Sequence, residues 1–598
     1  MDNQNKNLIL ATVLSFLVLV GWFLLFPPPK PEPRPEVAQT EATATGGTTA
    51  APGALPAETI VSREEVLTRS ERVPVKTARL GGSIALTGGR IDDLNLLDYF
   101  ETIQPGSPTV NLLRPAGSPG AYYALYGWSP GPGVAADAVP GPNTPWRVES
   151  GEALTEATPV TLVWDNGQGL TFRRKFSIDA NFMFTVSQSV ENAGATTVEL
   201  APYGIIARRG IPTNLKNFYI LHEGVIGMAD GKLQETKWKK LSDLPFDPAE
   251  QANLQKTEVA TNGWIGFTDH YWMSTLGAEP GRPFTSVTKY TPASDTFQTD
   301  MRLPTMTVAP GQTAEATTWL FAGAKEWATL RDYQRDPGID RFVDAIDWGM
   351  FWFLTKPIFR ALHLMHQVIG NMGLAIIGLT IFIKAILFPL AYKSYVSMSK
   401  MKALQPQMEK IKETAGDDRM KMQTEIMALY KKEKVNPAAG CLPILLQIPI
   451  FFSLYKVIFV TLELRHAPFF GWIKDLSAPD PTSILNFFGL LPWATPEHGS
   501  MFFILSIGVL PILLGMSMWL QMKLNPEPTD PTQAMIFAWM PWVFMFMMGG
   551  FASGLVVYWI ANNLITFTQQ YFIMRSQGVP PDVFGNITRT FRRKKKAE

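Results

Sequence analysis

The segment GLTIFIKAILF, residues 378–388, places one lysine, Lys384, inside an otherwise apolar run that extends from residue 372 to residue 392. A helix of that length rises roughly 30 Å, which matches the hydrocarbon core of a lipid bilayer. A lysine near the centre of such a helix costs on the order of 2.5–3.5 kcal/mol on insertion scales. Snorkelling is the alternative, but Lys384 lies ~12 Å from the predicted inner end, about twice the reach of its side chain. The segment therefore predicts a membrane-spanning helix that carries a functional charge.

Further apolar runs predict five more spans, at residues 8–26, 442–462, 501–522, 534–548 and 555–573. The first lies within residues 1–26 and is predicted to be an uncleaved signal anchor, because prolines follow it in place of a small-residue cleavage site. A cleaved secretory signal is the alternative. The predicted fold class is therefore a multi-pass α-helical membrane protein with six transmembrane helices.

Lysine and arginine are concentrated in the segment 393–441 and in the tail 574–598. The segment 463–500, by contrast, carries only Arg465 and Lys474. Because positively charged loops stay in the cytoplasm, residues 393–441, the loop 523–533 and both chain ends are predicted to lie inside. Residues 27–371 and 463–500 then lie outside.

The outer part begins with a segment rich in Pro, Ala, Thr and Gly, residues 27–60, which predicts a disordered tether. Residues 61–325 contain short runs of β-branched and aromatic residues bounded by turn residues, which predicts an all-β sandwich. Residues 326–371 predict a linker and an amphipathic helix at the outer face of the membrane. A helix packed on the β domain is the alternative.

Charge and composition exclude several classes of function. The net charge of the 598 residues is +1, but 25 basic and 16 acidic residues follow residue 340, and 28 and 36 precede it. A uniformly basic nucleic-acid-binding protein is excluded. The single cysteine, Cys441, excludes intramolecular disulfides and cysteine-only metal sites.

The sequence contains no motif that indicates an enzyme. Neither H-E-x-x-H nor a P-loop occurs in the sequence. Residues 127–131 match G-x-S-x-G, but Pro130 follows Ser129 where a nucleophile elbow needs a helix. We predict no cofactor, no metal site and no catalytic residue, and we do not expect an enzyme.

Polar side chains recur in the inner halves of three predicted spans. Gln447 lies ~8 Å from the cytoplasmic end of its span, and Asn562 and Asn563 lie ~15 Å from the inner end of the last. Each could be an ordinary hydrogen bond between helices, worth about 0.6–2 kcal/mol. Together with a lysine that has no carboxylate at similar depth, they predict a hydrated cavity that opens to the cytoplasm and is closed on its apolar outer side.

The cytoplasmic segment 393–441 predicts a helical hairpin with methionine-rich stripes. The stripes either pack on each other or bind varied apolar partners, since methionine side chains repack easily. The predicted recruitment residues are Met398, Met401, Met408, Asp417 and Met422. The tail residues predicted to contact ribosomal RNA or anionic phospholipids are Arg592, Arg593, Lys594, Lys595 and Lys596.

Three stretches of the chain resemble the YidC membrane-protein insertase family of Gram-negative type: NPAAGCLP at 436–443, QIPIF at 447–451 and SGLVVYW at 553–559. The resemblance implies a positively charged inner-leaflet groove made here by Lys384, Gln447, Asn562 and Asn563. It also implies an apolar substrate path past Phe451, Met547 and Trp559. The family usually carries arginine at the position of Lys384, so bidentate contact with a carboxylate is lost in this chain.

The resemblance further implies a galactose-mutarotase-like supersandwich without an enzymatic role, located in the periplasm, on a protein of the bacterial inner membrane. The implied partners are nascent membrane-protein substrates, the Sec translocon, the ribosome and the signal-recognition receptor. The predicted function is that of an insertase and chaperone that inserts nascent inner-membrane proteins and helps them fold, alone or with the translocon.

Two other functions remain as alternatives. A secondary transporter would use Lys384 as a solute or ion site, but the five C-terminal spans lack internal repeats and paired carboxylates. A tethered carbohydrate-active enzyme would use the outer domain.

Overall fold

The computed structural model describes residues 60–213, 215, 221–416, 418–433, 435, 442–491, 493, 506–525 and 531–579. All of them belong to one compact unit, residues 50–598. The predicted anchor at 1–26, nearly all of the tether, Asp417 and the tail residues Arg592, Arg593, Lys594, Lys595 and Lys596 lie outside the described residues.

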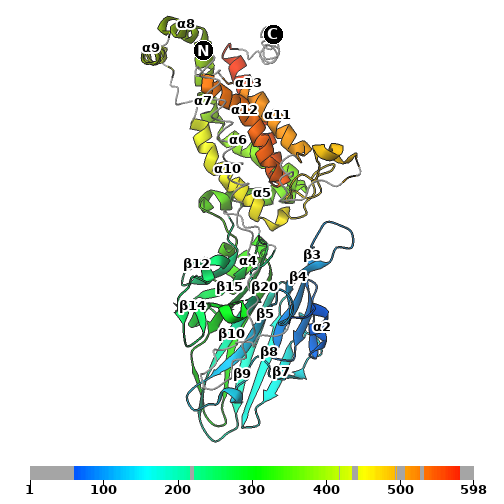
Figure 1. Ribbon diagram of the computed structural model, residues 1–598. Coiled ribbons are helices and arrows are strands. Elements are labelled where there is room, and N and C mark those ends of the chain that lie inside the picture. Colours follow the sequence, from blue (N-terminus) through cyan, green and yellow to red (C-terminus); the bar gives the residue numbers. More distant parts are fainter. Residues whose placement is uncertain are drawn as a thin grey trace. The chain divides into compact units, whose positions relative to one another are not determined.

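Two antiparallel sheets make up the β domain (Figure 1). The first runs in the order β1-β2-β3-β5-β10-β18-β17-β14-β13, with β4 beside β3 and β19 beside β10. Its strands are β1 (Arg72–Lys76), β2 (Leu80–Ala85), β3 (Arg90–Phe100), β4 (Thr109–Leu113), β5 (Tyr122–Pro130), β10 (Val198–Arg209), β13 (Phe246–Asp247), β14 (Ala252–Val259), β17 (Phe284–Thr291), β18 (Thr296–Arg302) and β19 (Met306–Val308).

The second sheet runs in the order β12-β11-β15-β16-β20-β9-β8-β7-β6. Its strands are β6 (Arg147–Ser150), β7 (Val160–Asp165), β8 (Leu170–Ile178), β9 (Met183–Asn192), β11 (Gly224–Ala229), β12 (Lys232–Lys237), β15 (Gly263–Thr268), β16 (Trp272–Ala278) and β20 (Thr313–Ala324).

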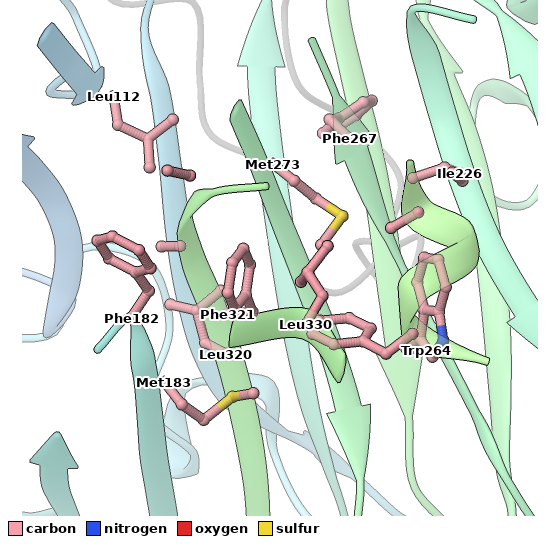
Figure 2. Close-up of a cluster of buried hydrophobic side chains, with 14 of the residues drawn as sticks. Leu112, Phe182, Met183, Ile226, Trp264, Phe267, Met273, Leu320, Phe321 and Leu330 are labelled. Carbon is pink, nitrogen blue, oxygen red and sulfur yellow. The ribbon is translucent and has the colours of Figure 1, made fainter. Parts of the chain in front are cut away.

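Alternation along the strands explains why the two sheets pack face to face. In β8, Leu170, Phe172, Arg174 and Phe176 are buried, while the alternate residues Thr171, Arg173 and Lys175 are more exposed, so one side of the strand faces the core. Aromatic rings join the sheets across this core, as Trp128 of β5 contacts Phe172 at 6.2 Å between ring centroids. Figure 2 shows part of the same core. The predicted all-β sandwich is confirmed.

Short helices border this domain: α2 (Arg63–Thr68), α3 (Trp238–Leu241) and α4 (Trp327–Arg335). The helical part then contains α5 (Trp352–Ile369), α6 (Met372–Ile386), α7 (Phe388–Ala403), α8 (Gln405–Ala415), α9 (Arg419–Lys432), α10 (Leu442–Val460), α11 (Val509–Met522), α12 (Pro531–Met547) and α13 (Ser553–Ser576). Helix α13 packs against α6, α7, α10 and α11 (Figure 1).

Length and hydropathy identify one candidate span among the described helices. Helices α6 and α7 qualify together, across a bend of 69° between them, whereas no single described helix qualifies alone. Shorter apolar helical stretches are Gln447–Val460, Val509–Met522 and Ala534–Gly550.

The predicted span 372–392 differs from the structure at its inner end. Helix α6 stops at Ile386, and α7 starts at Phe388 with Pro389 in its first turn, where a missing backbone N–H is tolerated. Helix α7 then continues to Ala403, so Met398 and Met401 lie on α7 and not in the hairpin. The hairpin itself consists of α8 and α9, because Pro406 opens a new helix.

Of the predicted span 501–522, residues 501–505 lie outside the described residues, and residues 506–508 are not helical. Helix α11 begins only at Val509, because side chains from an earlier segment cap it: Thr482 Oγ1 accepts the N–H of Val509 at 2.9 Å and Asp480 Oδ2 accepts that of Leu510 at 2.7 Å. The last two helices are longer than predicted, since α12 begins at Pro531 and α13 ends at Ser576.

The predicted amphipathic helix corresponds to α5. It packs against α6 and α10, and Trp327 of α4 contacts its Phe359 at 5.6 Å between ring centroids. Its other face leaves Phe353, Leu364 and Val368 exposed.

Candidate functional site

A cavity of about 40 Å³ lies among α6, α7, α10 and α13. Its lining residues are Thr380, Ile383, Lys384, Leu387, Leu390, Ala391, Tyr395, Gln447, Ile450, Tyr558, Asn562 and Gln569. At ~10–15 Å³ for each water molecule, it has room for about three waters. None of the described lining residues is acidic, so Lys384 supplies the formal charge of the cavity.

Lys384 is held by a neutral hydroxyl. Its Nζ donates a hydrogen bond to Thr566 Oγ1 at 2.9 Å, and Thr566 Oγ1 in turn donates to the carbonyl oxygen of Asn562 at 2.6 Å. A hydroxyl orients the ammonium without neutralising it. The positive charge is therefore left available to a negatively charged group that enters the cavity.

The two neighbouring asparagines face different surroundings. Asn562 lines the cavity, whereas Asn563 is 2% exposed and donates from Nδ2 to Ser517 Oγ of α11 at 3.0 Å. Successive helical residues are about 100° apart around the axis, so two adjacent side chains cannot face the same partner. Three of the four predicted groove residues, Lys384, Gln447 and Asn562, come together, and Asn563 does not join them.

An aromatic strip adjoins the cavity. Phe451 lies one helical turn beyond Gln447 on α10, and its ring centroid is 4.5 Å from that of Trp559 on α13. The Trp559 ring is 5.6 Å from that of Phe544 on α12. Met547, near the end of α12, is half exposed. We call Phe451, Trp559 and Phe544 the aromatic strip, and it connects the polar cavity to the apolar surface of α12.

The predicted recruitment residues within the described part of the chain lie on α7, α8 and α9. Met408 on α8 accepts a hydrogen bond from the Tyr430 hydroxyl of α9 at 3.4 Å, so the two helices pack on each other. Met398, Met401 and Met422 are only partly buried. Asp418 caps α9 by accepting the N–H of Lys421 at 3.0 Å.

Sequence reasoning missed two members of the cavity, Tyr395 and Tyr558. Tyr395 lies on α7, beyond the 69° bend that follows α6, so helical spacing within the predicted span does not indicate it. The charge pattern assigns it to the cytoplasmic segment 393–441. Gln569 also lines the cavity, and its buried Oε1 has no hydrogen-bond partner within the described part of the chain.

The chain matches two family models in succession. Residues 72–361 match the YidC periplasmic domain and residues 364–579 match the 60Kd inner membrane protein family. The chain is 61% identical to the membrane protein insertase YidC of Dinoroseobacter shibae and 62% identical to that of Roseobacter denitrificans, with full coverage of both chains in each case.

The chain belongs to the YidC family of membrane protein insertases. Among solved structures, it is similar to an active YidC insertase whose first transmembrane domain is resolved, at 18% identity and a TM-score of 0.35, covering 94% of this chain and 99% of that chain. Membership of the YidC family confirms the predicted insertase function, the inner-membrane location and the periplasmic β-sandwich. The transporter and the carbohydrate-active enzyme are set aside, because the YidC match covers the whole chain.

Proposed function

We propose that the cavity around Lys384 receives the short polar flank of a nascent membrane segment, while the apolar part of that segment leaves along the aromatic strip. The observation that carries this proposal is the adjacency of the two surfaces. Gln447 and Phe451 are one turn apart on α10, and Asn562 and Trp559 are one turn apart on α13. A substrate held at both surfaces has its polar and apolar parts in matching surroundings.

Such a cavity lowers the barrier to translocation of a polar flank. The flank crosses a shorter thickness of hydrocarbon, since polar side chains line the cavity and it has room for about three waters. Transfer of the apolar segment into lipid supplies ~0.8 kcal/mol per buried CH₂. For an acidic flank, the membrane potential adds ~2.3 kcal/mol per charge per 100 mV. No nucleotide is needed to drive the step.

The charge of Lys384 favours acidic flanks. A carboxylate 4 Å from an ammonium gains ~4 kcal/mol at an effective dielectric constant of 20. Water in the cavity screens part of this energy, and we expect roughly 1–2 kcal/mol to remain, which corresponds to about a 5–30-fold difference in rate.

Delivery of substrates is the role proposed for the cytoplasmic surfaces. Exposed Met420 and Met427 lie seven residues apart on α9, on one face of the helix, and offer an adaptable apolar surface. The Sec translocon and the signal-recognition receptor are the partners proposed for the hairpin. The ribosome and anionic phospholipids are those proposed for the basic tail.

The proposal is tested with purified protein in lipid vesicles. A model substrate carries either two Asp or two Asn residues in its translocated flank, and insertion rates are compared for the natural protein, Lys384→Gln and Lys384→Arg. We expect Lys384→Gln to slow the Asp substrate about 5–30-fold and the Asn substrate much less, with Lys384→Arg close to the natural protein. Equal slowing of both substrates would refute the role of the charge.

A further inference from the structure

The segment between α10 and α11 displays an unusual run of apolar side chains. Residues 481–493, PTSILNFFGLLPW, contain no charged residue. Leu490 is 76% exposed, Phe487 59% and Trp493 55%, and Ile484, Leu485 and Leu491 are also exposed. We call residues 484–491 together with Trp493 the apolar loop. In water, a surface of this kind would be unfavourable.

The apolar loop has a defined backbone. The N–H of Phe488 donates to the carbonyl oxygen of Ser483 at 2.7 Å, and Trp493 Nε1 donates to that of Leu485 at 2.8 Å. Phe487 and Phe488 adopt left-handed conformations with φ of 51° and 59°, which bulky side chains rarely do. The hydrogen bonds thus hold a strained backbone that keeps Phe487 and Trp493 exposed.

The apolar loop is fixed to the beginning of α11. The N–H of Ile484 donates to the carbonyl oxygen of Ile507 at 2.8 Å, and Ser506 Oγ donates to Ser483 Oγ at 2.7 Å. Helix α11 has 14 residues. It therefore rises only ~21 Å, roughly 9 Å less than the hydrocarbon core.

The family match places this loop on the periplasmic side. The periplasmic domain precedes α6, so the chain enters the membrane at α6 from outside, turns at the α8–α9 hairpin and returns through α10. The loop that follows α10 is periplasmic. It also continues the lipid-facing surface of α11, where Leu513 and Met516 are exposed.

We propose that the apolar loop inserts into the outer leaflet and contacts lipid acyl chains at the depth that α11 does not reach. Three observations support lipid as the occupant: the loop carries no charge, it is hydrogen-bonded to the residues that precede α11, and α11 is ~9 Å shorter than the hydrocarbon core. The tryptophan then lies where the aromatic belt of membrane proteins lies. This interaction is independent of the cavity around Lys384.

The single cysteine of the chain makes a labelling experiment direct. In a Cys441→Ser background, Phe487→Cys carries an environment-sensitive fluorophore, and Phe246→Cys, a phenylalanine 54% exposed on the β domain, is the matched control. The full-length protein is reconstituted into vesicles whose acyl chains are brominated. Quenching by the lipid is compared with quenching by aqueous iodide.

We expect lipid to quench the label at residue 487 at least several-fold more than the label at residue 246, and iodide to show the opposite order. A label at 487 that iodide reaches as readily as the control would overturn the proposal. Protection from both quenchers would also overturn it, because a protein would then cover the loop. Leu490→Cys repeats the test at a second position, and insertion activity verifies that each variant is folded.

Discussion

Replacing Asn563 by alanine should destabilise the helix bundle without altering how insertion depends on the charge of the substrate. Asn563 is buried between α13 and α11, and its Nδ2 donates to Ser517 Oγ at 3.0 Å. Ser517 Oγ also donates to the carbonyl oxygen of Leu514 at 2.8 Å, so its hydrogen keeps a partner in the variant. We therefore expect the pairwise energy of Asn563 and Ser517 to equal the net value of an interhelical hydrogen bond in a membrane, which is about 0.6 kcal/mol and at most ~1.7 kcal/mol.

A double-mutant cycle isolates this energy. The free energy of unfolding is measured in mixed detergent micelles for the natural protein, Asn563→Ala, Ser517→Ala and the double variant. Packing losses at each site cancel in the cycle, and only the pairwise energy remains. A coupling energy below ~0.3 kcal/mol would refute the contact, since that is the error of additivity.

The functional half of this prediction uses the neighbouring residue as its control. Asn562→Ala should weaken the insertion of substrates with polar flanks while changing stability less, because Asn562 lines the cavity. If Asn563→Ala abolished the preference for acidic flanks while Asn562→Ala kept it, the assignment of the two asparagines would be wrong.

Two further predictions concern packing and pH. Gly373→Ala should cost about 1–3 kcal/mol of stability, because its Cβ would lie 2.1 Å from Phe469 Cδ2. Gly378→Ala, with its nearest neighbours at 3.7 Å, should be neutral or stabilising. Thermal unfolding of both variants in detergent checks this, and equal midpoints would contradict it. In the β domain, partial burial raises the pKa of Glu250, but its two-point ion pair with Arg302, together with Lys289 and Lys256, outweighs burial and lowers that pKa to about 2. This carboxylate contributes stability above its ordinary pKa that is lost as the pH falls towards 2, so Glu250→Gln should be less stable at pH 7 and should lose less stability on acidification, as followed by circular dichroism; identical acid profiles would contradict the pairing.

The order of the helices could be predicted from the sequence, because a long apolar run is a strong local signal. Their ends could not. Helix α11 begins at Val509, where Asp480 and Thr482, about thirty residues earlier, accept its first backbone N–H groups. Nothing local to residues 501–508 indicates a cap supplied from so far away in the chain.

In the site, too, some residues could be predicted from the sequence and others could not. Lys384 could be found because a charge inside an apolar run is conspicuous. The difference between Asn562 and Asn563 depends on which helix lies on each side of α13, and that is a property of the assembled bundle. The bend of 69° after Ile386 likewise brings Tyr395 to the cavity from a segment that the charge pattern assigned to the cytoplasm.

The central claim is that the polar flank of a substrate occupies the cavity around Lys384, and crosslinking from α13 tests it most directly. A photoreactive amino acid is placed either at Asn562, which lines the cavity, or at Leu564, which is 46% exposed on the opposite side of the same helix. Each variant is illuminated with a ribosome-bound nascent chain stalled during insertion. The account predicts crosslinks from residue 562 to the polar flank and none from residue 564, whereas equal crosslinking from both positions would contradict it.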